Sequence, residues 1–587
     1  MDDLKRTAEL SSALKMERGG VIGKGIHFER SAADDVTMLK EWTSALEQQA
    51  SNARKRNSGI EGDIEDDEMI GGGDEYKAGA HLVQMPQQRC KTWDEAQEEV
   101  IAELSLNEKQ KRAIILIAAQ FSNNREQEQL LIFLGGEGGT GKSRVIKGIE
   151  SLFNKMGCKE MLQLSAASGA AADNIEGSII HSSLGLKVGK QVPSGRHFQK
   201  LKSHWAKKEI LVVDEVSMIS LTTLAEIDRN CKIVKENESP FGTLHVVLLS
   251  GDFYQLPPVI GQPLYWIPPA NRRNGKRVSS SQAMDESRGK ALWERFTNVI
   301  LLTEQMRQAE DTEFYGILKR AREGVLNESD YQKLSDKVSN GIEFGPGSPT
   351  IITCTNAIRH HLNIMGVLGM GAKTGEPVYL FIAKHEHHPS ISKSQLMAIG
   401  DESSKLPGPG IFAYTKGMPI MINANIYTDL GIVNGKEGRA VGVTLDPLAD
   451  VVHVGNNIYV VSQPPLCVYM EIEHSRFEQL RGLGENIFPV TPQKMAITMK
   501  QRNGHTGNEP ISISRTQVPC CPAFAITHFR SQGRTFYKVV LDLGSCQRLG
   551  KYQRFAAIYV MLSRVKSLKG LSFTRWFQES VLQVKAG

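Results

Sequence analysis

The sequence lacks the features that define several protein classes. Its eight cysteines, scattered over 587 residues, form no CxxC pair. This argues against a zinc ribbon or a disulfide framework, fits a reducing compartment, and leads us to expect ordinary buried thiols. No apolar run approaches the roughly 18 residues of a membrane span. The N-terminal MDDLKRTAEL is too acidic for a secretory or mitochondrial signal. We therefore expect a cytosolic or nuclear protein without membrane contact.

A large excess of one charge is also missing. The chain carries 70 basic and 65 acidic residues, a net charge of +5. Any contact with nucleic acid must therefore come from local clusters rather than from a global field. Two histidine pairs, His360-His361 and His387-His388, have no metal-ligand spacing with cysteine, so we expect surface histidines there.

The first part of the chain is polar. Residues 1–95 include the acidic block EGDIEDDE followed by GGG, which predicts an N-terminal region without regular structure. Helical periodicity begins near Thr92, and short β-rich apolar runs then alternate with helical segments: LLIFL, MLQLSAA, ILVVDE and HVVLLSGD. This alternation predicts a parallel sheet with helices on both faces over residues 96–300.

A second α/β unit follows and is interrupted. The runs TIITCT and KVVLDL predict its strands, in residues 301–416 and 513–587. Between them, residues 417–512 contain strand-like pieces separated by Gly, Pro and Asn turns, as in a small inserted β-barrel. The predicted fold class is therefore α/β, with parallel sheets and a β insertion.

The stretch GGEGGTGKSRVI fits the pattern GxxxxGK[ST], with a strand before it and a helix after it. Such a loop directs successive backbone N–H groups at phosphate oxygens, and the helix N-terminus adds positive potential. Lys142 is expected to reach the β- and γ-phosphates, and the Ser143 hydroxyl to bind Mg²⁺. A glycine-rich turn that binds nothing is disfavoured because both flanks fit. The nucleotide-binding residues expected here are Gly136, Gly138, Gly139, Thr140, Gly141, Lys142 and Ser143.

Two adjacent carboxylates end the strand ILVVDE. Behind a matched phosphate loop, Asp214 is expected to hold Mg²⁺ and Glu215 to polarise the attacking water, whereas in isolation such a pair would more often cap a helix. The next strand ends in LLSGDFYQLPPV, where Gln255 precedes a stiff Pro-Pro pair and is placed to sense the γ-phosphate.

Seven segments follow one another along the chain: LNEKQ, GGTGKS, DEVSM, GDFYQLPPV, LTEQMRQ, SQGRT and YVMLSRV. In this order they resemble the motifs of superfamily-one DNA helicases over about residues 104–573. The nearest match is the petite-integration-frequency (PIF) family, which moves 5′ to 3′. The resemblance implies two RecA-like P-loop NTPase domains with ATP in the cleft between them, and an SH3-like inserted barrel. By the same resemblance Gln110 would recognise adenine, Arg307 and Arg564 would reach the γ-phosphate, and Gly533 would couple nucleotide state to DNA.

Contact with DNA is expected next to the motif SIIHSSLGL, which resembles the family's DNA-contacting motif through His181. The following run, KQVPSGRHFQKLKSHWAKK, interleaves basic residues such as Lys200 with the aromatic rings of Phe198 and Trp205, which suits phosphate pairing and base stacking, although a solvated basic loop remains the alternative. The family's TIHKSQG is replaced by THFRSQG, in which Arg530 stands where lysine is usual. We expect Arg530 to contact DNA.

These residues favour an ATP-dependent, Mg²⁺-dependent 5′-to-3′ DNA helicase that acts on single-stranded DNA and duplex junctions. A nuclear role in DNA repair, recombination or telomere maintenance follows from the resemblance, and no mitochondrial transit peptide is recognisable. The alternative is an ATP-gated DNA-binding remnant of a mobile element without unwinding activity, because chains of this kind also resemble transposon-encoded, Helitron-like helicases. The hydrolytic set is complete, which favours the enzyme.

Overall fold

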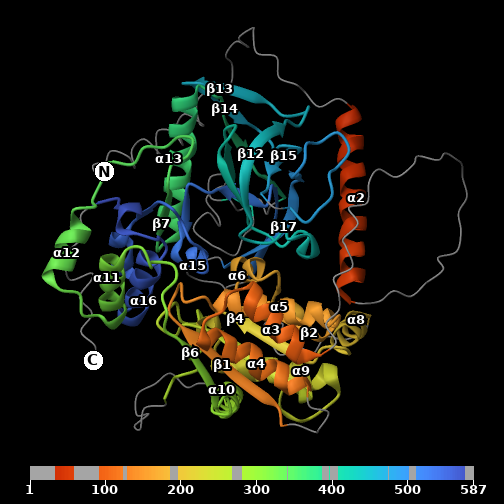
Figure 1. Ribbon diagram of the computed structural model, residues 1–587. Coiled ribbons are helices and arrows are strands. Elements are labelled where there is room, and N and C mark those ends of the chain that lie inside the picture. The colour runs from red at the N-terminus through yellow and green to blue at the C-terminus, as the bar shows by residue number, and fades with distance from the viewer. Residues whose placement is uncertain are drawn as a thin grey trace, which may run out of the picture.

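The computed structural model describes residues 33–58, 92–122, 128–185, 196–267, 280–339, 341–386, 396, 408–473, 475–500 and 510–575. In Figure 1 a first α/β domain, coloured orange to yellow, occupies the lower half of the molecule, and the later segments lie above and beside it.

The first domain is built on a six-stranded parallel sheet with strand order β3-β2-β4-β5-β1-β6. Alternate residues of each strand face opposite sides. Ile132 and Leu134 of β1 therefore pack against α4 and α5, whereas Leu131 and Phe133 pack on the side of α9. The parallel sheet predicted for residues 96–300 is confirmed. Its strands are β1 Leu130–Gly136, β2 Leu162–Ala166, β3 Ser178–Ile179, β4 Ile210–Asp214, β5 Val246–Gly251 and β6 Asn298–Leu302. Its helices are α3 Trp93–Glu103, α4 Glu108–Ser122, α5 Lys142–Lys155, α6 Gly169–Asn174, α7 Ile180–Ser183, α8 Arg196–Trp205, α9 Leu221–Lys235 and α10 Ser280–Trp293.

The second α/β unit has a four-stranded parallel sheet with order β20-β7-β21-β22. The chain leaves this sheet after β7 and re-enters it at β20, so the predicted interruption is observed. Its core is formed by strand residues together with α11 and α16. The strands are β7 Thr350–Thr353, β20 Ala525–Thr527, β21 Val539–Leu541 and β22 Leu571–Phe573, and the helices are α11 Thr312–Glu323, α12 Glu328–Ser335, α13 Asn356–Thr374, α15 His528–Ser531 and α16 Lys551–Leu562.

The interruption consists of strands, as expected, but it is longer than residues 417–512. Strands before and after that range pair with strands inside it: β8 with β14, and β19 with β11. The strands form three sheets, with orders β10-β8-β14-β13, β16-β15-β12-β11-β19 and β17-β18-β9. They are β8 Val378–Ile382, β9 Lys384–Glu386, β10 Ile411–Tyr414, β11 Pro419–Ile422, β12 Glu437–Thr444, β13 Val451–Gly455, β14 Ile458–Val461, β15 Cys467–Glu471, β16 Ile487–Val490, β17 Gln493–Lys500, β18 Pro510–Gln517 and β19 Cys520–Pro522. We call this the strand insert.

A long N-terminal helix corrects the prediction for residues 1–95. Helix α2 (Ala33–Ser58) lies beside the strand insert (Figure 1) and buries Trp42, Leu46 and Ala50 in the insert's core. The Trp42 indole donates to the Arg481 carbonyl at 2.8 Å, and its ring meets Tyr469 edge-on. A spacing of four residues puts these apolar side chains on one helix face, a signal hidden by the polar composition around it. The acidic block lies outside the described residues.

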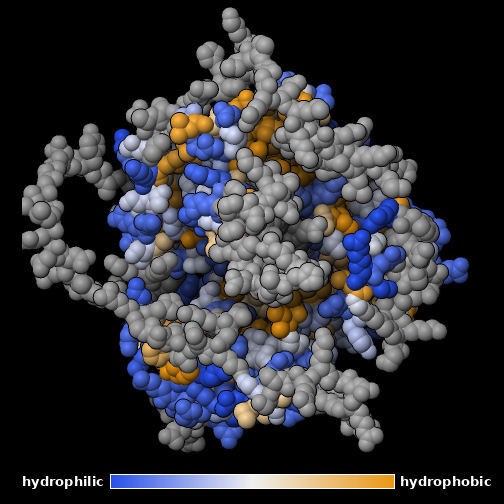
Figure 2. Space-filling model, turned by 180° about the vertical axis from the view of Figure 1, so that it is seen from behind, coloured by the Kyte–Doolittle hydropathy of each residue, from blue (hydrophilic) through white to orange (hydrophobic). Residues whose placement is uncertain are grey.

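The remaining expectations concern thiols, histidines and the surface. The seven cysteines within the described ranges are free, and five of them are buried. His361 is exposed on α13, and His387 and His388 lie outside those ranges. Figure 2 shows hydrophobic residues as separate patches among hydrophilic ones on the face that it draws. Within the part of the chain that the structure describes, no helix is long and apolar enough to cross a membrane.

Candidate active site

The phosphate loop joins β1 to α5 in a conformation that only its glycines allow. Gly139 and Gly141 have φ of +96° and +88°, in the left-handed region where a side chain is strained. A Cβ on Gly139 would also lie 2.2 Å from the Gln305 side chain. Gln305 Nε2 donates to the Gly138 carbonyl at 3.0 Å, and the Met306 backbone N–H donates to the Gly139 carbonyl at 2.9 Å. The motif LTEQMRQ therefore supports the loop from behind, a role that the sequence did not reveal.

Lys142 is the first residue of α5 and lies at the centre of this loop. Its Nζ donates to the carbonyls of Gly136 and Glu137, at 2.7 and 2.9 Å. Burial lowers the pKa of the lysine, and the nearby carboxylates Asp252, Glu215 and Asp214 oppose that shift. The ammonium is thus held by neutral oxygens that an anionic ligand can replace.

The acid pair ends the neighbouring strand β4. Glu215 has φ +55°, so the chain turns sharply and places its carboxylate beside Asp214. Burial raises the pKa of both groups, and the charge of Asp214 raises the pKa of Glu215 further. Asp214 Oδ1 is buried and has no hydrogen-bond partner in the part of the chain that the structure describes. An unpaired, buried carboxylate oxygen beside a phosphate loop suits a cation.

Two arginines, Arg307 and Arg564, face the phosphate loop and the acid pair across the cavity. The Arg564 guanidinium is fully buried and is held by the Val560 carbonyl at 2.6 Å and the Ser563 hydroxyl at 2.7 Å. Arg307 donates to the Ser563 carbonyl at 3.1 Å. Burial, and next the charge of Arg307, lower the pKa of Arg564 to about 9. Neighbouring cations that donate hydrogen bonds only to neutral oxygens favour an incoming anion.

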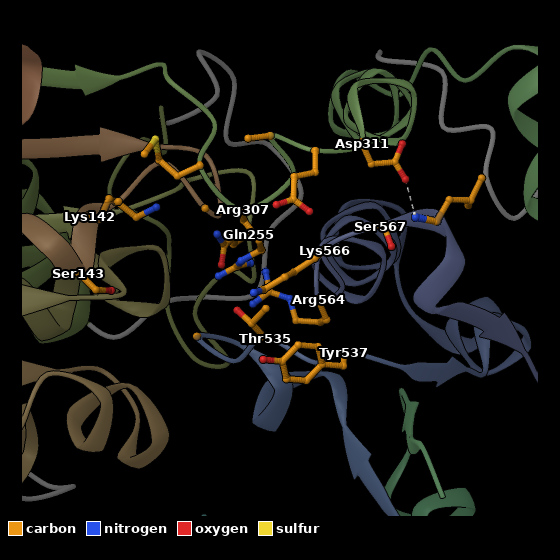
Figure 3. A pocket seen from close by; sticks show the side chains of 18 of the residues that line it. Lys142, Ser143, Gln255, Arg307, Asp311, Thr535, Tyr537, Arg564, Lys566 and Ser567 are labelled. Atoms are coloured by element: carbon orange, nitrogen blue, oxygen red, sulfur yellow. Dashed lines mark hydrogen bonds between the residues drawn. The ribbon is translucent and has the colours of Figure 1, made fainter. Parts of the chain in front are cut away.

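These groups surround one cavity of about 1160 Å³ between the two α/β units (Figure 3). Gln255 also faces it, and its Oε1 has no partner among the described residues. The cavity brings together most of the predicted catalytic and nucleotide-binding residues: Gly138, Gly139, Gly141, Lys142, Ser143, Asp214, Glu215, Gln255, Arg307, Gly533 and Arg564.

Three predicted nucleotide-binding residues do not line the cavity. Gln110 is buried behind the phosphate loop, where its Nε2 donates to the Thr140 carbonyl at 3.2 Å and its Oε1 accepts from the Asn107 backbone. Thr140 donates to the Glu137 carbonyl, and Gly136 is the last residue of β1. In this arrangement Gln110 supports the loop, because its carboxamide is already engaged by the protein.

Sequence reasoning missed two contacts that join the α/β units. Gln532 Nε2 donates to Glu215 Oε2 at 2.8 Å, so the SQGRT motif reaches the predicted general base directly. Arg322 of α11 pairs with Asp252, at 2.9 Å, and its guanidinium lies 4.2 Å from the ring centroid of Tyr254. Asp252 stands within the quoted motif GDFYQLPPV and could have been noticed, but nothing local marks Arg322 as its partner.

The predicted DNA contacts are dispersed. His181 is exposed on α7, and partial burial lowers its pKa. Lys200 is exposed on α8, whereas Phe198 packs against the core of the first domain. The prediction that Trp205 stacks on DNA bases is wrong, because its ring is fully buried and its indole donates to the Ser183 carbonyl. Lys208 is likewise buried and donates to the Leu162 carbonyl.

Arg530 is less available than expected. Its guanidinium donates to Asn423 Oδ1 at 3.0 Å and to Asn434 Oδ1 at 3.3 Å, both in the strand insert, and burial lowers its pKa. The expected DNA contact is thus already paired with neutral acceptors of the protein.

The parallel sheets and the phosphate loop at the end of β1 define an α/β fold of the P-loop class. Within that class, residues 105–332 match the PIF1-like helicase family, which confirms the resemblance predicted from the seven motifs.

Known helicases are similar to this chain over about three quarters of its length. The chain is 26% identical over 481 residues to the ATP-dependent DNA helicase PIF1 of Emericella nidulans, covering 77% of this chain and 59% of the relative. It is 24% identical to the helicase RRM3 of Saccharomyces cerevisiae, covering 79% and 64%. The chain thus spans 59% and 64% of the length of these two relatives.

Solved structures share the fold. The crystal structure of Pif1 helicase from Candida albicans aligns with a TM-score of 0.55 at 21% identity, over 82% of this chain and 97% of that one. Pif1 helicase from Bacteroides in complex with ADP-AlF3 and single-stranded DNA aligns with a TM-score of 0.55 at 20% identity, over 82% and 95%. These likenesses support the α/β fold with parallel sheets.

Proposed function

We propose that this chain is an ATP-dependent DNA helicase that translocates 5′ to 3′ on single-stranded DNA and unwinds duplex at junctions. One observation carries the proposal: a lysine, an acid pair, a glutamine and two arginines from two α/β units face a single cavity. The printed names of the relatives, ATP-dependent DNA helicases, point the same way. Roles in DNA repair and recombination, and a nuclear location, are part of the proposal.

The side chains divide the work of hydrolysis. Lys142 leaves its two carbonyl acceptors for the β- and γ-phosphates, and Glu215 orients and deprotonates the attacking water. Arg307 and Arg564 stabilise negative charge on the γ-phosphate from the second unit. Gln255 senses the γ-phosphate through the attacking water, from which its unpaired carbonyl oxygen can accept a hydrogen bond. Because these groups come from both units, the cavity closes fully only around a ligand.

The chain's own residues fit a magnesium ion. Ser143 and Asp214 line the cavity together, and the buried Asp214 Oδ1 has no protein partner in the described ranges. Hydroxyl, carboxylate and water oxygens are the ligands that Mg²⁺ prefers. When bound, Mg²⁺ neutralises phosphate charge.

The domain layout follows from the same proposal. Residues 96–300 are assigned to the first RecA-like domain. The parts of residues 301–416 and 513–587 that carry the sheet β20-β7-β21-β22 are assigned to the second, and β8, β9, β10 and β19 go with the strand insert. We assign an SH3-like module to the strand insert. Its five-stranded antiparallel sheet, β16-β15-β12-β11-β19, and the apolar core that the sheet shares with the rest of the insert support this assignment.

The test is an ATPase assay with and without single-stranded DNA, followed by unwinding of a fluorescent duplex with a 5′ tail. Stimulated hydrolysis with unwinding supports the helicase. Binding of ATP and DNA without hydrolysis would support the alternative, an ATP-gated DNA-binding remnant of a mobile element. A Lys142→Ala variant provides the background rate.

A further inference from the structure

A short helix, α6, brings the first α/β domain into contact with the strand insert. Helix α6 lies at their boundary in Figure 1. A Cβ built on its first residue, Gly169, would lie only 2.6 Å from the Asn434 carbonyl oxygen of the insert. The two parts are thus in backbone contact at this point, and whatever passes between them must separate α6 from the insert.

A single carboxylate holds this boundary together. Asp173, near the end of α6, pairs with Lys436 of the insert, with Nζ and Oδ2 3.1 Å apart, and approaches Arg476, with 3.6 Å between the nearest nitrogen and oxygen. The side chains of Asp173 and Lys436 are 23% and 17% exposed, so solvent screens the pair only in part. One carboxylate therefore faces two cations.

More cations surround this pair. Arg534 is paired with Glu437 and donates to the Gly435 carbonyl, while Arg530 contacts only neutral acceptors of the insert. The groups joined by these contacts comprise four cations (Lys436, Arg476, Arg530, Arg534) and two carboxylates (Asp173, Glu437), an excess of two positive charges. A site with this excess is ready for an anion that carries more than one negative charge.

The boundary is also connected to the cavity. Asn174, the neighbour of Asp173, donates from Nδ2 to the Gly533 carbonyl at 3.2 Å. Gln532, which precedes Gly533, donates to Glu215 at 2.8 Å. Moving α6 away from the insert therefore disturbs the residue that holds the predicted general base.

We propose that Asp173 takes the place of a nucleic-acid phosphate in the DNA-free protein. Its carboxylate holds Lys436 and Arg476, and a backbone phosphate of single-stranded DNA displaces it to bind the same two cations. The inference rests on the proposed function. It adds an autoinhibitory contact and two phosphate-binding residues in the strand insert, and it explains why the boundary is closed without DNA. Opening the boundary moves Asn174 away from the Gly533 carbonyl and thereby transmits DNA binding to the cavity.

The test measures binding of fluorescent oligothymidylate to the full chain by anisotropy at several salt concentrations. Asp173→Asn keeps the shape and removes the competing charge, so we expect a Kd about two- to fivefold lower, as for a partly exposed ion pair. Lys436→Gln and Arg476→Gln should each raise Kd and make binding less dependent on salt. The matched control is Glu471→Gln, which removes an exposed carboxylate of the same insert and should change Kd less than twofold.

A triple variant separates direct competition from a general charge effect. If Asp173 acts through Lys436 and Arg476, then adding Asp173→Asn to Lys436→Gln/Arg476→Gln gives no gain in affinity. An equal gain in that background, or equal effects of Asp173→Asn and Glu471→Gln, would overturn the proposal. If the wild-type chain binds no oligothymidylate, the proposed function fails instead, so the two failures are distinguishable.

Discussion

Replacing Gln532 by leucine should shift the pH dependence of ATP hydrolysis. Burial and Asp214 raise the pKa of Glu215, and the hydrogen bond from Gln532 is one of the influences that lower it. Removing that bond therefore raises the pKa of Glu215, so a smaller fraction of the base is ionised at a given pH. A hydrogen bond to a charged group contributes about 1.5–3 kcal/mol, which corresponds to a roughly ten- to hundredfold smaller ratio of ionised to protonated base.

The assay is DNA-stimulated ATPase against pH at saturating ATP and DNA. The acid limb of the profile should move to higher pH in Gln532→Leu and the rate should recover as the pH rises, because the base itself is intact. Gln308→Leu is the control, since Gln308 is equally buried but donates to the Val565 carbonyl, away from Glu215. If Gln532→Leu is slower at every pH and its acid limb stays in place, Gln532 does not act through the ionisation of Glu215.

Three further outcomes are expected. Lys142→Ala should lose nucleotide affinity and turnover. Glu215→Gln should still bind a fluorescent ATP analogue without hydrolysing it. Hydrolysis by Glu215→Gln at the wild-type rate would exclude Glu215 as the base. A duplex with a 5′ tail should be unwound and one with only a 3′ tail should not, and the opposite preference would contradict the proposed direction. Arg322→Ala leaves the buried Asp252 carboxylate without its cation and should lower the free energy of unfolding in guanidinium by about 3–5 kcal/mol, part of which Asp252→Asn should restore.

The sequence predicts best those parts of the fold that are determined by a few consecutive residues. The strand LLIFL and the glycines after it determine β1 and the phosphate loop, because burial on both faces and positive φ each demand particular residue types. The acid pair could be located in the same way, because it directly follows the apolar residues of the buried strand β4. Each of these segments can be recognised from its own residues, without knowing which distant segments pack against it.

Contacts between distant segments could not be predicted in this way. Trp205 lies in a basic, polar run that suggests a surface. Its ring is nevertheless buried, because α8 packs against α9 and the indole donates to the Ser183 carbonyl. Arg530 and Gln532 are adjacent in one motif, but one binds the strand insert and the other the acid pair. Partner choice of this kind depends on the tertiary structure.

Helix α2 affects how the molecule can be divided and in what order it folds. The helix covers the strand insert through contacts that span 439 positions of the chain, as between Trp42 and Arg481. During synthesis helix α2 leaves the ribosome long before the strand insert is made, so it can pack only after the insert has folded. A fragment that begins at Thr92 keeps all seven motifs but uncovers the apolar face under Trp42 and Leu46. We expect such a fragment to aggregate through this exposed apolar face, and we expect a separately supplied peptide of residues 33–58 to restore its solubility.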